Sequence, residues 1–379
     1  MKNKVLIISN FHENAIISRS NMAYKYFLDR EFSTTVLYSN FSHSLKKFRY
    51  FKNEDFIPIS TIEYSSSLSL KRILSYLIFS FKVFKYIRKS KFDIIYVNLP
   101  PNILAIAVLL NRRRGVKIIL DILDLWPESF PLNKGFFKKV ILLVFSKIFG
   151  GIRGITIRNS DYCITESKFF FKKLNLNEKK GSKTILLKKF QNVPPIINDL
   201  SDEISIVYLG NLGNIYDFDS LFKIIKGVEK IRLVHLHIIG LGPISNWFFS
   251  ELETQGINYT YHGASFDENL KREILSSCWF GFNGYKDNTE VALSYKSIDY
   301  LSYGVPLINS AKEDTFNLVA EEQVGFNFSS KNIDELITKL ATISFPEVIN
   351  MKKKSYSVFQ DKFSGESYYK EMDLVINSL

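Results

Sequence analysis

Short apolar runs alternate with helical patterns along both halves of this 379-residue chain, and no other sequence feature restricts its fold so strongly. Val5–Ser9, Lys117–Asp121, Ile204–Leu209 and Val234–Ile239 are four such runs. Each is short enough to be a buried strand, and each is followed by a loop and then by a helical pattern. This alternation predicts an α/β protein with two doubly wound, Rossmann-like domains that face each other across a cleft.

The distribution of charge divides the chain into two halves near residue 190. Residues 1–190 contain 34 Lys and Arg against 13 Asp and Glu, whereas residues 191–379 contain 16 against 25. The first half is therefore strongly basic and the second acidic, although the whole chain carries +12. The polar segment 191–202, with its Pro194-Pro195 pair, is the expected linker between a domain of residues 1–190 and one that starts at residue 203.

Composition excludes several classes of protein. Cys163 and Cys278 form neither a disulfide framework nor a metal-binding spacing, which suits a reducing cytoplasm. The N-terminal apolar run is too short for a signal peptide, and no stretch reaches 18 uninterrupted apolar residues. No nucleic-acid-binding motif is present, so we expect no nucleic-acid partner.

A helix is predicted over about Ser294–Tyr303. Ser294 suits the N-cap, and Gly304 suits the left-handed position after the last turn. Lys296 in the first turn adds a full charge to helix amides that already favour phosphate, and Asp299 one turn later can accept hydrogen bonds from a ribose diol. Phosphate and ribose together indicate a nucleotide, but the spacing also suits a surface helix with a solvated lysine and aspartate.

A second group of candidates follows the strand predicted at Lys117–Asp121. Asp121, Asp124 and Glu128 surround Trp126, just beyond the carboxyl end of a parallel strand, where ligands bind in open α/β sheets. A carboxylate there can take a proton from a hydroxyl or hold sugar hydroxyls, and a tryptophan can stack on a sugar. The alternative is a loop of solvated acids around a buried Trp126.

The segment Lys296-Ser-Ile-Asp-Tyr-Leu-Ser-Tyr-Gly-Val-Pro-Leu-Ile308 resembles the donor-binding helix of family-four GT-B glycosyltransferases, and the resemblance extends over most of the chain. It is especially similar to the bacterial branch that builds capsular polysaccharide and glycosylates adhesins. Two positions depart from the pattern. The first of two glutamates usual in the family would fall at Val291, with Glu290 one place away, and Asn214 replaces a basic residue after the glycine turn.

The resemblance implies a GT-B fold with an acceptor-binding domain (1–190), a nucleotide-sugar-binding domain (203–355) and a C-terminal helix (356–379) that crosses back to the first domain. It implies a retaining, metal-independent hexosyltransferase that moves a hexose or hexosamine from a nucleotide diphosphate sugar, expected to be UDP-linked, to a saccharide hydroxyl on a glycan, glycolipid or glycoprotein. No cofactor is expected, since the nucleotide sugar is a substrate and UDP a product.

The site residues fall into three groups. The expected catalytic residues are Asp121, Asp124 and Lys296; the donor-binding residues are Gly213, Asn214, Ser294, Tyr295, Lys296 and Asp299; and the acceptor-binding residues are Arg19, Trp126 and Glu128. Arg19 suits a solvated surface position equally well. Two other functions remain open. A GT-B sugar-nucleotide epimerase would act without an acceptor, and a non-catalytic accessory subunit would keep the fold and lose the site.

Residues 70–91 and 134–153 are both basic and strongly apolar. Helices of this composition can lie on an anionic leaflet, with apolar side chains among the headgroups. We therefore expect a cytoplasmic protein held peripherally on the inner face of the plasma membrane, and the sequence also allows a homo-oligomer. The alternative is that the aromatic and aliphatic side chains are core and the lysines are merely solvated.

Overall fold

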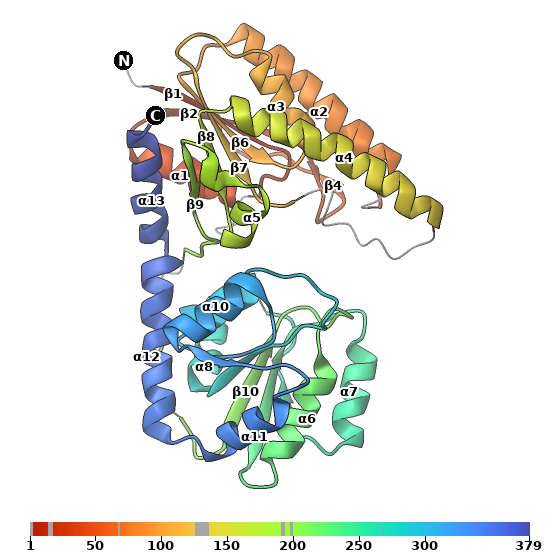
Figure 1. Cartoon of the computed structure of the whole chain (residues 1–379), viewed down its shortest axis with the longest axis vertical. Helices are drawn as coiled ribbons and strands as arrows, with labels where there is room; N and C mark the ends of the chain where they lie inside the picture. The colour runs from red at the N-terminus through yellow and green to blue at the C-terminus, as the bar shows by residue number, and fades with distance from the viewer. Residues whose placement is uncertain are drawn as a thin grey trace. The chain divides into compact units, whose positions relative to one another are not determined.

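The computed structural model describes residues 3–13, 18–66, 69–125, 136–190, 194–197, 200–265 and 267–379; of residues 136–145 and 178 it describes the backbone alone. The chain forms two compact units, which are shown in Figure 1. The first unit comprises Met1–Leu186 with Tyr368–Leu379, and the second comprises Leu187–Ser367.

The first unit is built on a parallel sheet of seven strands. In order across the sheet these are β5 (Phe56–Ile59), β2 (Ser33–Ser39), β1 (Lys4–Ser9), β6 (Ile94–Leu99), β7 (Lys117–Ile122), β8 (Tyr162–Thr165) and β9 (Ser182–Thr184). A short antiparallel hairpin, β3 (Phe41–Ser42) and β4 (Lys47–Phe48), stands apart from it. The chain travels from β1 outward through β2 to β5 and then returns to place β6 on the other side of β1, as in doubly wound folds.

Helices cover both faces of this sheet because successive side chains of a strand point to opposite faces. The helices are α1 (Arg19–Asp29), α2 (Leu70–Lys89), α3 (Asn102–Leu109), α4 (Phe136–Asn159) and α5 (Lys168–Lys173), followed by a 3₁₀ turn at Leu176–Glu178. Helices α2, α3 and α4 lie side by side (Figure 1). Leu6 and Ile8 of β1 share a core with Phe79 of α2, whereas Tyr96 of β6 contacts Phe27 of α1.

The second unit has a parallel sheet of six strands. Their order is β12 (Tyr259–Tyr261), β11 (Val234–Ile239), β10 (Ile204–Leu209), β13 (Phe280–Asn283), β14 (Leu307–Asn309) and β15 (Gly325–Asn327). Its helices are α6 (Phe218–Val228), α7 (Ser245–Thr254), α8 (Glu268–Ser277), α9 (Tyr295–Ser302), α10 (Glu313–Glu322), α11 (Ile333–Thr342) and α12 (Phe345–Lys362). The last helix, α13 (Gly365–Asn377), begins in the second unit and ends in the first.

Two parallel sheets with helices on their faces confirm the predicted α/β class. The cysteines lie in the cores: Cys163 and Cys278 are both buried, and burial raises the pKa of each thiol to about 12. Among the helices that the structure describes, none is long and apolar enough to cross a membrane.

Candidate functional site

Helix α9 forms as predicted because its ends carry suitable caps. The Ser294 hydroxyl accepts a hydrogen bond from the Ser297 backbone N–H at 3.1 Å. Gly304 has φ +65°, the left-handed conformation that suits glycine after a last helical turn. Ile298 and Leu301 are fully buried, so one face of the helix is fixed against the core.

The N-terminus of α9 lies where the sheet of the second unit reverses its strand order. The chain travels from β10 outward to β12 and then returns to place β13 on the other side of β10. The crevice at the carboxyl ends of two such strands is the usual ligand site of an open α/β sheet. The loop Gly210–Gly213 follows β10 at this point, and a Cβ at Gly210 would lie 3.5 Å from Lys296 Cε. The structure thus brings the glycine turn and the α9 lysine together.

Two further glycines hold this turn in place. A Cβ at Gly240 would lie 1.8 Å from the Gly210 carbonyl oxygen, and one at Gly242 would lie 2.2 Å from the Leu212 carbonyl oxygen. Backbone segments therefore approach each other more closely than any side chain would permit. Neighbouring backbone thus helps to hold the turn in place.

Lys296 is buried, and among the residues that the structure describes no acidic group pairs with its amine. Its side chain extends among three tyrosine rings, with Nζ 3.6 Å from the ring centre of Tyr216, 4.1 Å from that of Tyr208 and 5.6 Å from that of Tyr285. Within the described part of the chain, Nζ has no hydrogen-bond partner. Burial lowers the pKa of Lys296 well below its usual value. An aromatic face attracts a cation more weakly than an anion does. The three rings are therefore a poor substitute for a negatively charged partner.

The other predicted donor residues surround the same helix terminus. Ser294 is the N-cap, and its hydroxyl also donates to Asn283 Oδ1 at 3.2 Å. Tyr295 is exposed, Gly213 is buried in the turn, and Asn214 beside it is exposed. Their predicted role in donor binding stays a prediction.

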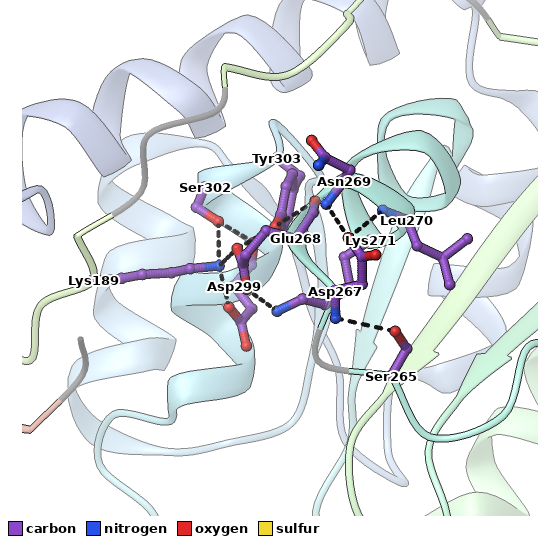
Figure 2. Close-up of polar contacts among 10 residues, drawn as sticks. All are labelled: Lys189, Ser265, Asp267, Glu268, Asn269, Leu270, Lys271, Asp299, Ser302 and Tyr303. Carbon is purple, nitrogen blue, oxygen red and sulfur yellow. Dashed lines mark hydrogen bonds and ion pairs between the residues drawn. The ribbon is translucent and has the colours of Figure 1, made fainter. Parts of the chain in front are cut away.

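Asp299 belongs to a charged cluster on the second unit (Figure 2). Its Oδ1 lies 2.6 Å from the Lys189 ammonium, which also lies 3.1 Å from Glu268 Oε2 and 4.7 Å from the ring centre of Tyr303. Burial opposes ionisation of Glu268, but hydrogen bonds from Lys271 and Tyr303 and the charge of Lys189 outweigh it and lower the pKa of Glu268 to about 2. Asp299 itself is a quarter exposed, so a ligand can reach it.

Asp121 and Arg19, which we predicted as catalytic and acceptor-binding, form a buried ion pair in the first unit. Arg19 donates from Nε to Asp121 Oδ2 at 3.1 Å and from its terminal nitrogen to Oδ1 at 2.9 Å. Tyr96 and Asn98 also donate to Asp121, and Arg19 donates to the Ile185 carbonyl oxygen at 3.0 Å. Both side chains are almost fully enclosed, and this arrangement links α1, β6 and β7.

Asp124 lies two residues beyond the end of β7 and is partly exposed. Its near neighbour is Glu166, which directly follows the adjacent strand β8. Burial, opposed by Arg19 and reinforced by Asp121 and Asp124, raises the pKa of Glu166 to about 8. A protonated carboxyl group is thereby expected beside Asp124 at this sheet edge at neutral pH. Trp126 and Glu128 lie outside the described residues.

The three histidines of the second unit form a polar cluster. His237 Nδ1 lies 3.0 Å from His262 Nε2, and His235 Nε2 lies 2.8 Å from Thr260 Oγ1. Burial and the two neighbouring histidines lower the pKa of His237 to about 4. Across the part of the chain that the structure describes, no group of three or more His, Cys, Asp or Glu side chains is placed to hold a metal ion.

Sequence reasoning missed the tyrosines around Lys296, the lysine beside Asp299 and the acid beside Asp124. Tyr208 lies near the end of β10 and Tyr285 follows β13, and these two strands are adjacent only in the folded sheet. Lys189 is 110 residues from Asp299 in the chain. Glu166 alone had a local signal, because it directly follows the apolar run Tyr162–Thr165 in the sequence.

No protein-family model and no curated protein matches the chain. Several solved structures match the chain in fold. HepE from Anabaena, in complex with UDP and glucose, has a TM-score of 0.63 at 13% identity over the full length of both chains. Sucrose-phosphate synthase from Thermosynechococcus elongatus has a TM-score of 0.69 at 12% identity, covering 99% of this chain and 98% of its own. WaaG, a glycosyltransferase involved in lipopolysaccharide biosynthesis, has a TM-score of 0.63 at 12% identity, covering 98% of this chain and 99% of its own. The chain therefore has the GT-B fold of glycosyltransferases.

Proposed function

We propose that this protein is a retaining, metal-independent glycosyltransferase of GT-B family four, and that it moves a hexose or hexosamine from a UDP-sugar to a saccharide hydroxyl. The observation that carries the proposal is the buried, unpartnered Lys296 amine at the N-terminus of α9, beside the Gly210 turn and at the strand-order reversal of the sheet. A diphosphate supplies the negative charge that this position lacks. HepE, with the same fold, was solved with UDP and with UDP-glucose, which supports UDP as the nucleotide.

In this proposal the second unit holds the donor. Lys296 and the first-turn amides of α9 bind the diphosphate and stabilise the charge that grows on it as it leaves. Gly213 and Asn214 line the turn beside it, with Ser294 and Tyr295 at the helix terminus. Asp299 accepts hydrogen bonds from the ribose hydroxyls.

The first unit holds the acceptor in the same proposal. Asp124 is the carboxylate best exposed to hold or deprotonate an acceptor hydroxyl, with Trp126 and Glu128 contributing from the following segment. Asp121 and Arg19 act indirectly, because their buried pair fixes the strand from which Asp124 projects. Capsular polysaccharide or another bacterial surface glycan is the proposed product.

The experiment is a thermal-shift panel of UDP-, GDP- and dTDP-sugars, followed by a transfer assay with the sugar that binds. A ligand at 100 times its dissociation constant should stabilise the protein by about 2.7 kcal/mol. Stabilisation by a UDP-sugar and transfer to a saccharide support the proposal. Release of an epimerised sugar nucleotide without transfer would make the protein an epimerase, and failure of every nucleotide to bind would make it an accessory subunit.

We further propose that α2 holds the enzyme on the inner face of the plasma membrane. Leu70, Leu74, Leu77 and Phe81 recur every three or four residues along α2, and all four are exposed, by 84%, 49%, 43% and 57% respectively. Basic residues complete that face without any acidic residue: Lys71, Lys82, Lys85, Arg88 and Lys89. An apolar stripe with lysines around it suits an anionic leaflet.

Vesicle co-sedimentation tests this location. Binding should require anionic lipid and fall between low and high salt, because each lysine near the surface contributes about 1 kcal/mol. Lys82→Glu with Lys85→Glu should weaken it, whereas Lys223→Glu with Lys226→Glu on α6 should not. Equal binding to neutral and anionic vesicles, or to neither, would refute the membrane assignment and leave the donor site untouched.

A further inference from the structure

Lys189 lies between two carboxylates in a way that the donor-site proposal does not explain. The chain enters the second unit at Leu187, and the Lys189 backbone N–H donates to the Phe363 carbonyl oxygen at 2.8 Å, which fixes the base of the side chain. The Lys189 side chain is 7% exposed, and its ammonium lies between Asp299 on α9 and Glu268 at the start of α8 (Figure 2). An enclosed lysine shared by two helices orients both of its partners.

The two carboxylates depend on Lys189 to different degrees. Glu268 also accepts hydrogen bonds from Lys271 and from the Tyr303 hydroxyl, the latter at 2.5 Å. Asp299 binds Lys189 through Oδ1 alone, and its Oδ2 has no hydrogen-bond partner among the residues that the structure describes. Loss of Lys189 would therefore leave Glu268 anchored and Asp299 without its anchor.

Repulsion would add to that loss of contact. Asp299 Oδ1 and Glu268 Oε2 lie 2.6 Å and 3.1 Å from the same nitrogen, so the two carboxylates are close neighbours. Without the ammonium, like charges at this separation either turn apart or bind a proton. Either response would change the carboxylate that we assign to the ribose.

We infer that Lys189 is a positioning residue for the donor nucleotide, which holds Asp299 Oδ1 so that Oδ2 is presented to the ribose hydroxyls. The inference rests on the proposed function, because it assumes that Asp299 binds ribose. It adds a residue from the segment at which the chain enters the second unit, far from α9 in sequence. Lys189 touches no ligand in this scheme and acts through Asp299.

The test compares UDP with 2′,3′-dideoxy-UDP, which lacks the ribose hydroxyls, by titration calorimetry on the full-length protein. Lys189→Met should weaken UDP binding roughly tenfold, as expected when a charge-assisted contact is lost, and should leave dideoxy-UDP binding nearly unchanged. Lys189→Arg should restore most of the UDP affinity. Lys271→Met is the matched control, because it removes a lysine from the same cluster that touches Glu268 and not Asp299.

A double-mutant cycle with Asp299→Ala completes the test. If Lys189 acts through Asp299, Lys189→Met should cost little further UDP affinity once Asp299 is alanine. Equal weakening of UDP and dideoxy-UDP by Lys189→Met, or full additivity in the cycle, would overturn the inference and leave Lys189 a structural residue. Failure of the unaltered protein to bind UDP would refute the proposed function itself, which is a separate result.

Discussion

Two buried charged sites, one in each unit, differ in the partners that the protein provides. Arg19 and Asp121 in the first unit bind each other through two hydrogen bonds, and Tyr96 and Asn98 complete the carboxylate. Lys296 in the second unit is similarly buried, but tyrosine rings surround its amine in place of an anion. Burying a charge is costly unless it is paired, so removing one partner of the first arrangement should destabilise the fold, whereas the second suits the anionic ligand that we propose.

Asp124→Asn should produce the largest effect, which is on the rate of sugar transfer. It tests the contrast between the enclosed Asp121 and the accessible Asp124 at one sheet edge. Transfer should fall about 10²–10⁴-fold if this carboxylate acts on the acceptor hydroxyl. Folding and UDP binding should persist, since Asp124 is partly exposed and lies in the unit that we do not assign to the donor. Initial rates with saturating donor measure this, and transfer at the parent rate would remove Asp124 from the mechanism.

Arg19→Met should lower the free energy of unfolding by about 3–5 kcal/mol, because it leaves the Asp121 carboxylate buried and unpaired. Urea unfolding followed by tryptophan fluorescence measures the loss. Whatever fraction remains folded should bind UDP normally. A stability equal to that of the parent protein would show that the buried pair contributes nothing net to the fold.

Lys296→Met, unlike Arg19→Met, should raise the free energy of unfolding. Methionine keeps the unbranched stem among the tyrosines and removes an unsatisfied polar group, which should stabilise the free protein by about 1–3 kcal/mol. UDP affinity should fall by about 1.5–3 kcal/mol with the loss of charge-assisted hydrogen bonds. Thermal melting with and without UDP measures both effects. Lower stability together with unchanged affinity would make Lys296 a structural residue.

The affinity for UDP should also depend on pH through Lys296. The pKa of this lysine is lowered in the free protein, and a bound diphosphate should raise it. Burial raises the pKa of the surrounding Tyr208, Tyr216 and Tyr285, so these rings stay neutral. Between the free and bound pKa values, binding takes up a proton, and the affinity falls as pH rises, by at most about tenfold per pH unit.

Titration calorimetry in two buffers of different ionisation enthalpy counts the protons taken up. It should be run above about pH 8, where the terminal phosphate has already titrated. Lys296→Met is the control and should take up none. Equal heats in both buffers for the parent protein would show that Lys296 keeps its charge state when UDP binds.

Arg30→Met should have the smallest effect on the free energy of unfolding. Its comparison with Arg19→Met separates the contribution of burial from that of pairing geometry. Arg30 follows α1, as Arg19 begins it, and binds Asp373 through two nitrogens at 2.9 Å and 2.6 Å. Both side chains of this pair are more than a third exposed. Exposed ion pairs contribute little, because water screens them and side-chain ordering opposes them. A loss of stability as large as that of Arg19→Met would show that pairing geometry, not burial, sets the effect.

The sequence predicted the elements whose signals are local. The strands predicted at Ile204–Leu209 and Val234–Ile239 begin and end at those residues in the structure, because short apolar runs mark them. Strand β5 (Phe56–Ile59) has a weaker local signal, because Pro58 interrupts its pattern. The strand predicted at Lys117–Asp121 extends one residue further, to Ile122.

The candidate site was predictable only in part for the same reason. Helix α9 and its charged first turn could be predicted, because the signals for a capped helix lie within eleven residues, at Ser294, Lys296 and Gly304. The partners of Arg19 and Asp299 lie about a hundred residues away and are set by strand order and helix packing. A pattern read along one chain carries no information on such pairs.

The enclosed thiols of the native chain make it suited to site-specific labelling. With the pKa of both raised to about 12 and neither side chain reachable by reagent, the protein should be unreactive toward maleimides at neutral pH. A cysteine introduced at the exposed Asn214 would then be the sole reactive thiol, with no need to remove Cys163 or Cys278. A fluorophore attached there would lie on the turn beside Lys296 and would test in real time whether a nucleotide reaches the proposed donor site, even before any acceptor is known.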